Sequence, residues 1–223
     1  MSDNAQLPAT GLKVVADEVT YSGDTALLQV ARIAGVTGSE GSKTVVEPSA
    51  AEVMIGNVGG KTVVIGANFT RPSDTNAYAA GDAVTNSTSS PSPMTFDGAS
   101  RFNGGSGVIT SAILISSANQ STKGLFDLYL YDTSPAADND NAAWTPSDGE
   151  TETFIGRISF NVADVGDAAA GASGNVAYFV HGLSIPFKSG GGNNDIFGLL
   201  VTRNAYTPVS AEKFTVRLGI IQD

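Results

Sequence analysis

His181 is the only histidine in this 223-residue sequence, so any serine-type catalytic triad would have to use it as the base. No Gly-x-Ser-x-Gly stretch supplies a matching nucleophile, and the sequence contains no cysteine. The residue types for nucleophilic catalysis are therefore not assembled, and we predict a structural or surface role for His181.

The segment 132–152 is the most acidic part of the chain, with six Asp and Glu residues and no Lys or Arg. The run Asp138-Asn139-Asp140-Asn141 offers the hard oxygen ligands that calcium prefers. An EF-hand loop would carry glycine at its sixth position, where this sequence has Ala143. We therefore predict a solvated acidic loop, with a calcium site as the alternative.

Two carboxylate pairs, Asp127 with Asp132 and Glu150 with Glu152, have the residue types of a glycosidase. That reaction needs two carboxyl groups facing each other across a cleft, which sequence spacing does not define. With 22 Asp and Glu residues in the chain, such pairs are expected by chance.

Trp144, Tyr129 and Tyr131 could stack on a sugar, although aromatic residues on a strand more commonly cover a core edge or a subunit contact. The Gly-rich stretches lack the Gly-Lys-Ser/Thr of a P-loop. We predict no catalytic residue, no cofactor and no metal ion, and hence a protein that is not an enzyme.

The formal net charge of −10 bears on the choice of partner. Nucleic acids and anionic membrane surfaces bind basic side chains, so we predict that neither is a partner. No apolar run reaches the length of a membrane span, and the polar N-terminus lacks the layout of a signal peptide. We expect a soluble protein that stays where it is made until it assembles.

The elements that would position these residues are strands. Charged residues make up only 15% of the chain, whereas Gly is abundant, and this composition favours short strands joined by turns. Apolar, strand-like runs are found at residues 108–115, 125–131, 154–160, 176–180, 185–187, 196–201 and 214–220, and the run 125–131 alternates clearly. With edge strands near Tyr78 and Phe96, they predict eight or nine strands after residue 70 and an all-β, jelly-roll-like β-sandwich. Helix is expected only at 141–144 or 162–170.

Residues 1–66 carry shorter, more widely spaced apolar runs, so we predict an N-terminal extended β arm or small β appendage there, and the sandwich body at 67–223. The arm pairs with the body or with another subunit, and the sequence leaves both open. Its predicted interface residues are Tyr21, Leu27, Leu28, Val30, Ile33, Val45 and Val46.

Several stretches resemble structural proteins of tailed bacteriophages and prophages. In the N-terminal part these are residues 16–30 (ADEVTYSGDTALLQV) and 38–42 (GSEGS). Further along they are residues 78–84 (YAAGDAV), 102–107 (FNGGSG) and 128–135 (LYLYDTSP). The resemblance touches much of the chain, but its motifs are rich in turns and carry no catalytic signature.

The resemblance implies a capsid decoration (cement) protein that binds the major capsid protein and stabilises the shell. It also implies a homotrimer on the capsid surface of the virion, assembled in the cytoplasm of the bacterial host. A receptor- or carbohydrate-binding module of a tail or fibre is the alternative.

Overall fold

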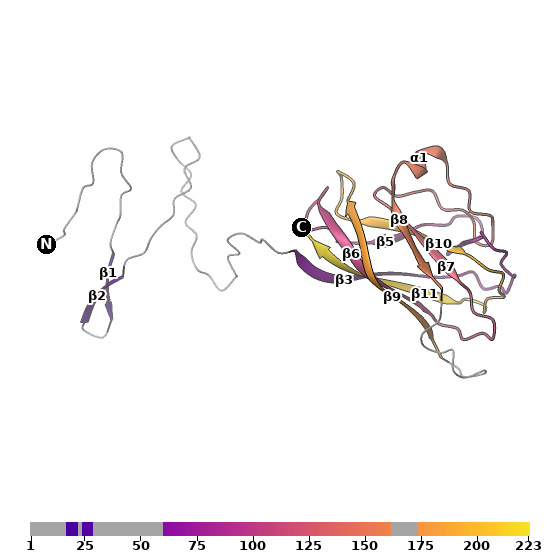
Figure 1. Ribbon diagram of the computed structural model, residues 1–223, viewed down its shortest axis with the longest axis horizontal. Helices are drawn as coiled ribbons and strands as arrows, with labels where there is room; N and C mark the ends of the chain where they lie inside the picture. The colour runs from indigo at the N-terminus through magenta and orange to yellow at the C-terminus, as the bar shows by residue number, and fades with distance from the viewer. Residues whose placement is uncertain (1–16, 22–23, 29–59, 162–173) are drawn as a thin grey trace. The chain divides into compact units, whose positions relative to one another are not determined.

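A computed structural model describes residues 17–21, 24–28, 60–161 and 174–223 of the chain (Figure 1). The chain divides into two compact units, Met1–Gly56 and Asn57–Asp223. In the first unit, β1 (Asp17–Tyr21) and β2 (Asp24–Leu28) pair antiparallel as a hairpin.

The second unit, which we call the body, contains two antiparallel sheets (Figure 1). The four-stranded sheet has the order β3 (Lys61–Thr70), β11 (Lys213–Gln222), β6 (Ser106–Ser116), β9 (Val176–Lys188). The five-stranded sheet contains β4 (Ala83–Val84), β5 (Met94–Phe96), β10 (Ile196–Thr202), β7 (Phe126–Tyr131) and β8 (Phe154–Phe160). In this sheet β4 and β5 both pair with β10, which is followed by β7 and β8.

The pairing is nested: the first strand of the body pairs with the last, β3 with β11, and the next strands, β4 and β5, pair with β10. This order of strands in two facing sheets is that of a jelly roll. The predicted all-β, jelly-roll-like sandwich is confirmed.

Alternation of apolar and polar residues explains why the four-stranded sheet has one buried face. In β11, Phe214, Val216, Leu218 and Ile220 are fully buried, and the residues between them point away from the core. Strands with this period bury one face of a sheet.

Phe126 on β7 lies where the two sheets meet. Its ring packs edge-on against Tyr178, Tyr206 and Phe214, at centroid distances of 5.9, 5.6 and 5.3 Å. Such edge-to-face contacts add to the free energy gained by burying the rings.

The two sheets differ in what covers their outer sides. Strand β10 is buried along its whole length, because Phe197 and Leu199 pack outward into a second apolar cluster that includes Tyr131 and Trp144. The same cluster buries Tyr131 on β7, and Asp127, which is also buried on β7, lies beside Arg157 and Arg203. The outer side of the four-stranded sheet, in contrast, has exposed side chains on β3, β9 and β11 and half-buried ones on β6.

Three sequence predictions differ from the structure. The predicted boundary at residue 66 falls inside β3, which pairs with β11 over its full length and so belongs to the body. His181 and Gly182 do not end a strand: β9 continues through them, with an irregularity at Gly182, whose φ is +70°.

The described helix lies at Asp148–Thr151, not at 141–144, while 162–170 is outside the described residues. It begins with a capping box in which the side chains of Ser147 and Glu150 bond each other's backbone N–H groups.

Candidate functional site

The predicted interface residues of the N-terminal unit fall partly on its hairpin. Tyr21 lies opposite Asp24, and Leu27 and Leu28 lie on β2. The other four predicted residues lie outside the described residues: Val30, Ile33, Val45 and Val46. Within the described parts of the chain, β1 and β2 pair only with each other.

The residues that could have done chemistry are bound to protein partners. His181 is exposed on β9, with its ring stacked on that of Phe179 at a centroid distance of 6.1 Å. Asp127 lies 3.4 Å from Arg157 and 3.5 Å from Arg203.

Glu150 is bound at the start of the short helix, where its carboxylate accepts from the backbone N–H groups of Ser147 and Ala136, both at 2.7 Å. These hydrogen bonds lower the pKa of Glu150.

The two aspartates of the candidate calcium run also have protein donors. Asp138 accepts from the backbone N–H of Thr145 at 2.9 Å, while Asp140 is buried against Arg71. The described residues contain no group of three or more His, Cys, Asp or Glu side chains that could hold a metal ion.

The aromatic residues considered for sugar stacking cover the core. Tyr129 and Trp144 stack on each other with ring centroids 4.0 Å apart, and Tyr131 is fully buried beside Phe154. Burial raises the pKa of Tyr131 to about 12. These rings therefore face one another and the sheet, as expected for the edge of a core.

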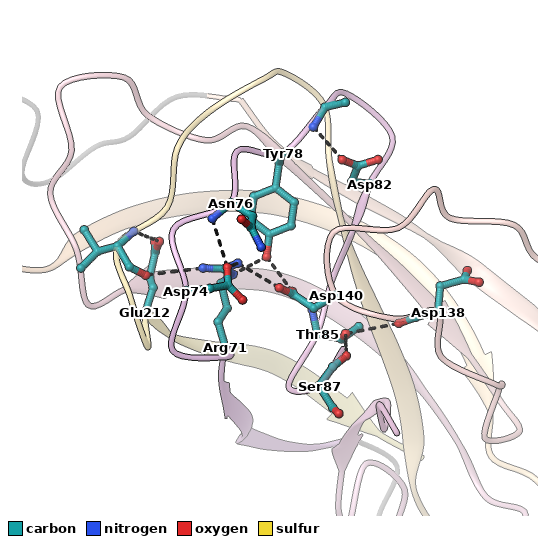
Figure 2. Close-up of polar contacts among 12 residues, drawn as sticks. Arg71, Asp74, Asn76, Tyr78, Asp82, Thr85, Ser87, Asp138, Asp140 and Glu212 are labelled. Carbon is teal, nitrogen blue, oxygen red and sulfur yellow. Dashed lines mark hydrogen bonds and ion pairs between the residues drawn. The ribbon is translucent and has the colours of Figure 1, made fainter. Parts of the chain in front are cut away.

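A buried ion cluster, shown in Figure 2, was not predicted from the sequence. We define it as Arg71, Tyr78 and Asp140, all at most 5% exposed. Arg71 donates to Asp140 at 2.9 Å and to the Tyr78 hydroxyl, and Tyr78 donates to Asp140 at 2.6 Å. Asp140 also accepts from the backbone N–H of Thr85 at 2.9 Å.

The ionisation of this cluster follows from its contacts. Burial disfavours the charged guanidinium, but the interactions with Tyr78 and Asp140 outweigh it and raise the pKa of Arg71. Burial, together with the hydrogen bond to Asp140, raises the pKa of Tyr78. The cluster therefore contains a cation, a neutral phenol and a carboxylate acceptor, and it ties the loop after β3 to the loop after β7.

Glu212 lies next to this cluster, just before β11, and it is 2% exposed. Its backbone carbonyl accepts from the N–H of Arg71 at 2.9 Å, and its carboxylate accepts from Ser116 and from Gln120. Burial raises the pKa of Glu212, and these hydrogen bonds oppose the rise without cancelling it.

We expect Glu212→Gln to raise the free energy of unfolding at pH 7. A folded-state pKa above the unfolded value means that the native protein binds the proton more tightly. Stability is therefore lost as pH rises from the unfolded value, about 4.3, through the folded one. The neutral amide should remove this loss. Urea unfolding of both proteins from pH 4 to pH 8 should therefore show that the free energy of unfolding of Glu212→Gln exceeds that of the unaltered protein by an amount that grows with pH. A constant difference would contradict the assignment.

The outer side of the four-stranded sheet, which we call the open sheet face, carries exposed and half-buried side chains. Its cross-strand register places Gly66, Arg217, Ile113 and Phe179 in one row across all four strands. Val64 is 70% exposed on β3, and Phe179 and Ile221 are each 38% exposed on β9 and β11.

The open sheet face could be foreseen only in part. The alternation in residues 214–220 predicts one outward side for that strand, whereas the row across the four strands depends on pairings between residues that are far apart in sequence.

No model of a known protein family matches this chain, and no curated protein sequence matches it. Solved structures that are similar to this chain include chains from two capsid structures. A chain of the "Cyanophage Pam1 capsid asymmetric unit" shares 14% identity over 80% of this chain and 99% of its own, with a TM-score of 0.33. A chain of the "Capsid of Ralstonia phage GP4" shares 15% identity over 78% of this chain and 93% of its own, with a TM-score of 0.34. Within the described residues, no helix has the length and apolar character that a membrane crossing requires.

Proposed function

We propose that the protein is a non-enzymatic structural component of a phage particle, which binds the outside of the capsid and stabilises it by bridging neighbouring capsomers. The major capsid protein is its proposed partner and the capsid surface its proposed location. The sequence stretches that resemble phage structural proteins support the class of protein.

The observation that carries bridging is the division of the chain into two compact units, because a bridge needs two attachments on one chain. The body has its own buried core and a broad open sheet face. The N-terminal unit contains the hairpin β1–β2, and a two-stranded hairpin is only marginally stable by itself. Adding such a hairpin to the sheet edge of a neighbouring protein would satisfy its free backbone groups.

Two linked attachments bind more tightly than either alone, because the second forms at a high effective concentration. Deleting residues 2–50 should therefore leave a folded body whose occupancy on shells at limiting concentration falls by about 100-fold or more. The probe is capsid shells from particles of the encoding phage made without this protein, and the measurement is bound protein per shell after sedimentation.

Circular dichroism and a thermal melt of the deleted variant serve as the folding control. Shells carrying the full chain should also release their contents at a higher temperature than bare shells. Unchanged occupancy of a folded deletion variant would exclude bridging by the N-terminal unit, and absence of binding by the full chain would exclude the proposed function.

A further inference from the structure

We propose that the open sheet face is a docking surface for an acidic protein surface. The inference rests on the proposed function for the identity of that surface, which would be the outside of the capsid shell. Its argument comes from the exposure, the charge and the register of the four strands.

The first step is exposure. The solvated face of an antiparallel sheet ordinarily carries polar side chains, and large apolar ones are buried. Here Val64 is 70% exposed, and Ile221 and Phe179 are 38% exposed, on three strands of one sheet. On β6, the half-buried Ile113 pairs with Phe179, and the half-buried Val108 pairs with Ile221. Exposed large apolar side chains on three strands of one sheet face favour a contact surface.

The second step is charge. None of the 22 Asp and Glu residues lies in the four strands of this sheet, although the chain has a net charge of −10. Lys188, Lys213 and Arg217 point outward from it. The acids that flank β11 lie beyond its ends, where Glu212 is buried and Asp223 accepts from Ser106 at 2.7 Å. The face is thus locally basic on an acidic protein.

The third step is the position of Arg217. It is exposed on an inner strand of the sheet, with Gly66 on one side and Ile113 on the other. Arg217 takes part in none of the ion pairs among the described residues. A guanidinium between a glycine and an apolar side chain can bind a carboxylate through two parallel hydrogen bonds once a partner excludes water.

These features favour an acidic protein over other occupants. A second copy placed face to face would bring like charges together, which disfavours that pairing. Nucleic acid binding would need many phosphate contacts, whereas this face has few cations and the protein as a whole repels polyanions. An acidic surface with apolar patches satisfies both the charge and the exposed apolar area.

The test uses opposite charges at one exposed position. Asn68 points outward from β3 beside Thr215, so Asn68→Lys and Asn68→Glu in the full chain have similar effects on the strand and differ in charge. The two Asn68 variants are compared with Arg217→Glu for binding to the bare shells at low ionic strength. Arg101→Glu, in the loop between β5 and β6, is the matched control. Denaturant unfolding confirms that each variant is folded.

Asn68→Glu and Arg217→Glu should each weaken shell binding about tenfold, and 0.5 M salt should reduce the difference. Asn68→Lys should bind at least as tightly as the unaltered chain, and Arg101→Glu should stay within about twofold because isolated surface charges contribute little.

Equal binding by the two Asn68 variants, while the unaltered chain binds, would overturn the docking surface and leave the proposed function intact. Absence of binding by the unaltered chain would overturn both. Light scattering without shells provides a further check, because an oligomer that Arg217→Glu dissociates would identify a second copy as the occupant. Retention of the unaltered chain by duplex DNA would identify nucleic acid. Either outcome would overturn the proposal.

Discussion

Asp140→Ala should lower the free energy of unfolding by about 3–5 kcal/mol, which is the cost of removing one partner of a buried ion pair. The side chains of Asp140 and Arg71 are both fully inaccessible to solvent. Without the carboxylate, the guanidinium of Arg71 would be buried without its fully buried counter-charge. The Tyr78 hydroxyl and the Thr85 N–H would lose their acceptor as well. Urea unfolding at pH 7, followed by circular dichroism, measures the loss.

Asp138→Ala is the matched control, because Asp138 belongs to the same loop but its carboxylate accepts only from the exposed Thr145 in the described contacts, and its backbone bond from Thr85 is kept in the variant. It should cost less than about 1 kcal/mol. Combining Arg71→Met with Asp140→Ala removes both charges, so the double variant should lose less than the sum of the two single losses. Similar losses of unfolding free energy for Asp138→Ala and Asp140→Ala would show that the buried ion cluster does not stabilise the fold more than an exposed hydrogen bond does.

Phe126→Ala should destabilise the body by about 3–5 kcal/mol, through lost burial and the cavity left behind. The ring is 1% exposed and contacts three other rings that come from β9, β11 and the loop before β11. Because two of those rings are fixed on paired strands of the opposite, four-stranded sheet and the third on a loop, they cannot all move inward to fill the space. Guanidinium unfolding monitored by circular dichroism gives the change.

The control for this substitution is Phe102→Ala, which removes the same number of atoms from a side chain that is 62% exposed. Its effect should stay within about 0.5 kcal/mol. A loss for Phe126→Ala no larger than that of the control would mean that the sheets repack around the deleted ring.

Much of the fold follows from the sequence, because its strands alternate in burial. The run 214–220 shows this directly, since its alternate apolar residues are the buried ones in β11. The separate runs 176–180 and 185–187 predict two strands, with Gly182 between them. In the structure the glycine accommodates an irregularity within one long strand, held by its pairing with β6.

The buried ion cluster could not be predicted, because its members are polar residues in loops that only the tertiary fold brings together. Arg71 and Asp140 are 69 positions apart, and each lies in a stretch that reads as solvated loop. The capping box, in contrast, has a local signal in the sequence. The Ser-x-x-Glu spacing of Ser147 and Glu150 predicts the start of the short helix. Local sequence patterns thus predict helix caps and strands, but they do not predict polar contacts between residues that are far apart in sequence.

The pairing of β3 with β11 has a consequence for how the protein is made. Residues 61–70 remain without their partner until residues 213–222 have been synthesised, and such long-range pairings fold slowly. A chain that terminates before residue 213 lacks an inner strand of the four-stranded sheet, so it also lacks the row that contains Arg217. Under the proposed function, truncated products cannot present the surface that recognises the shell, and assembly discriminates against them without a separate checking step.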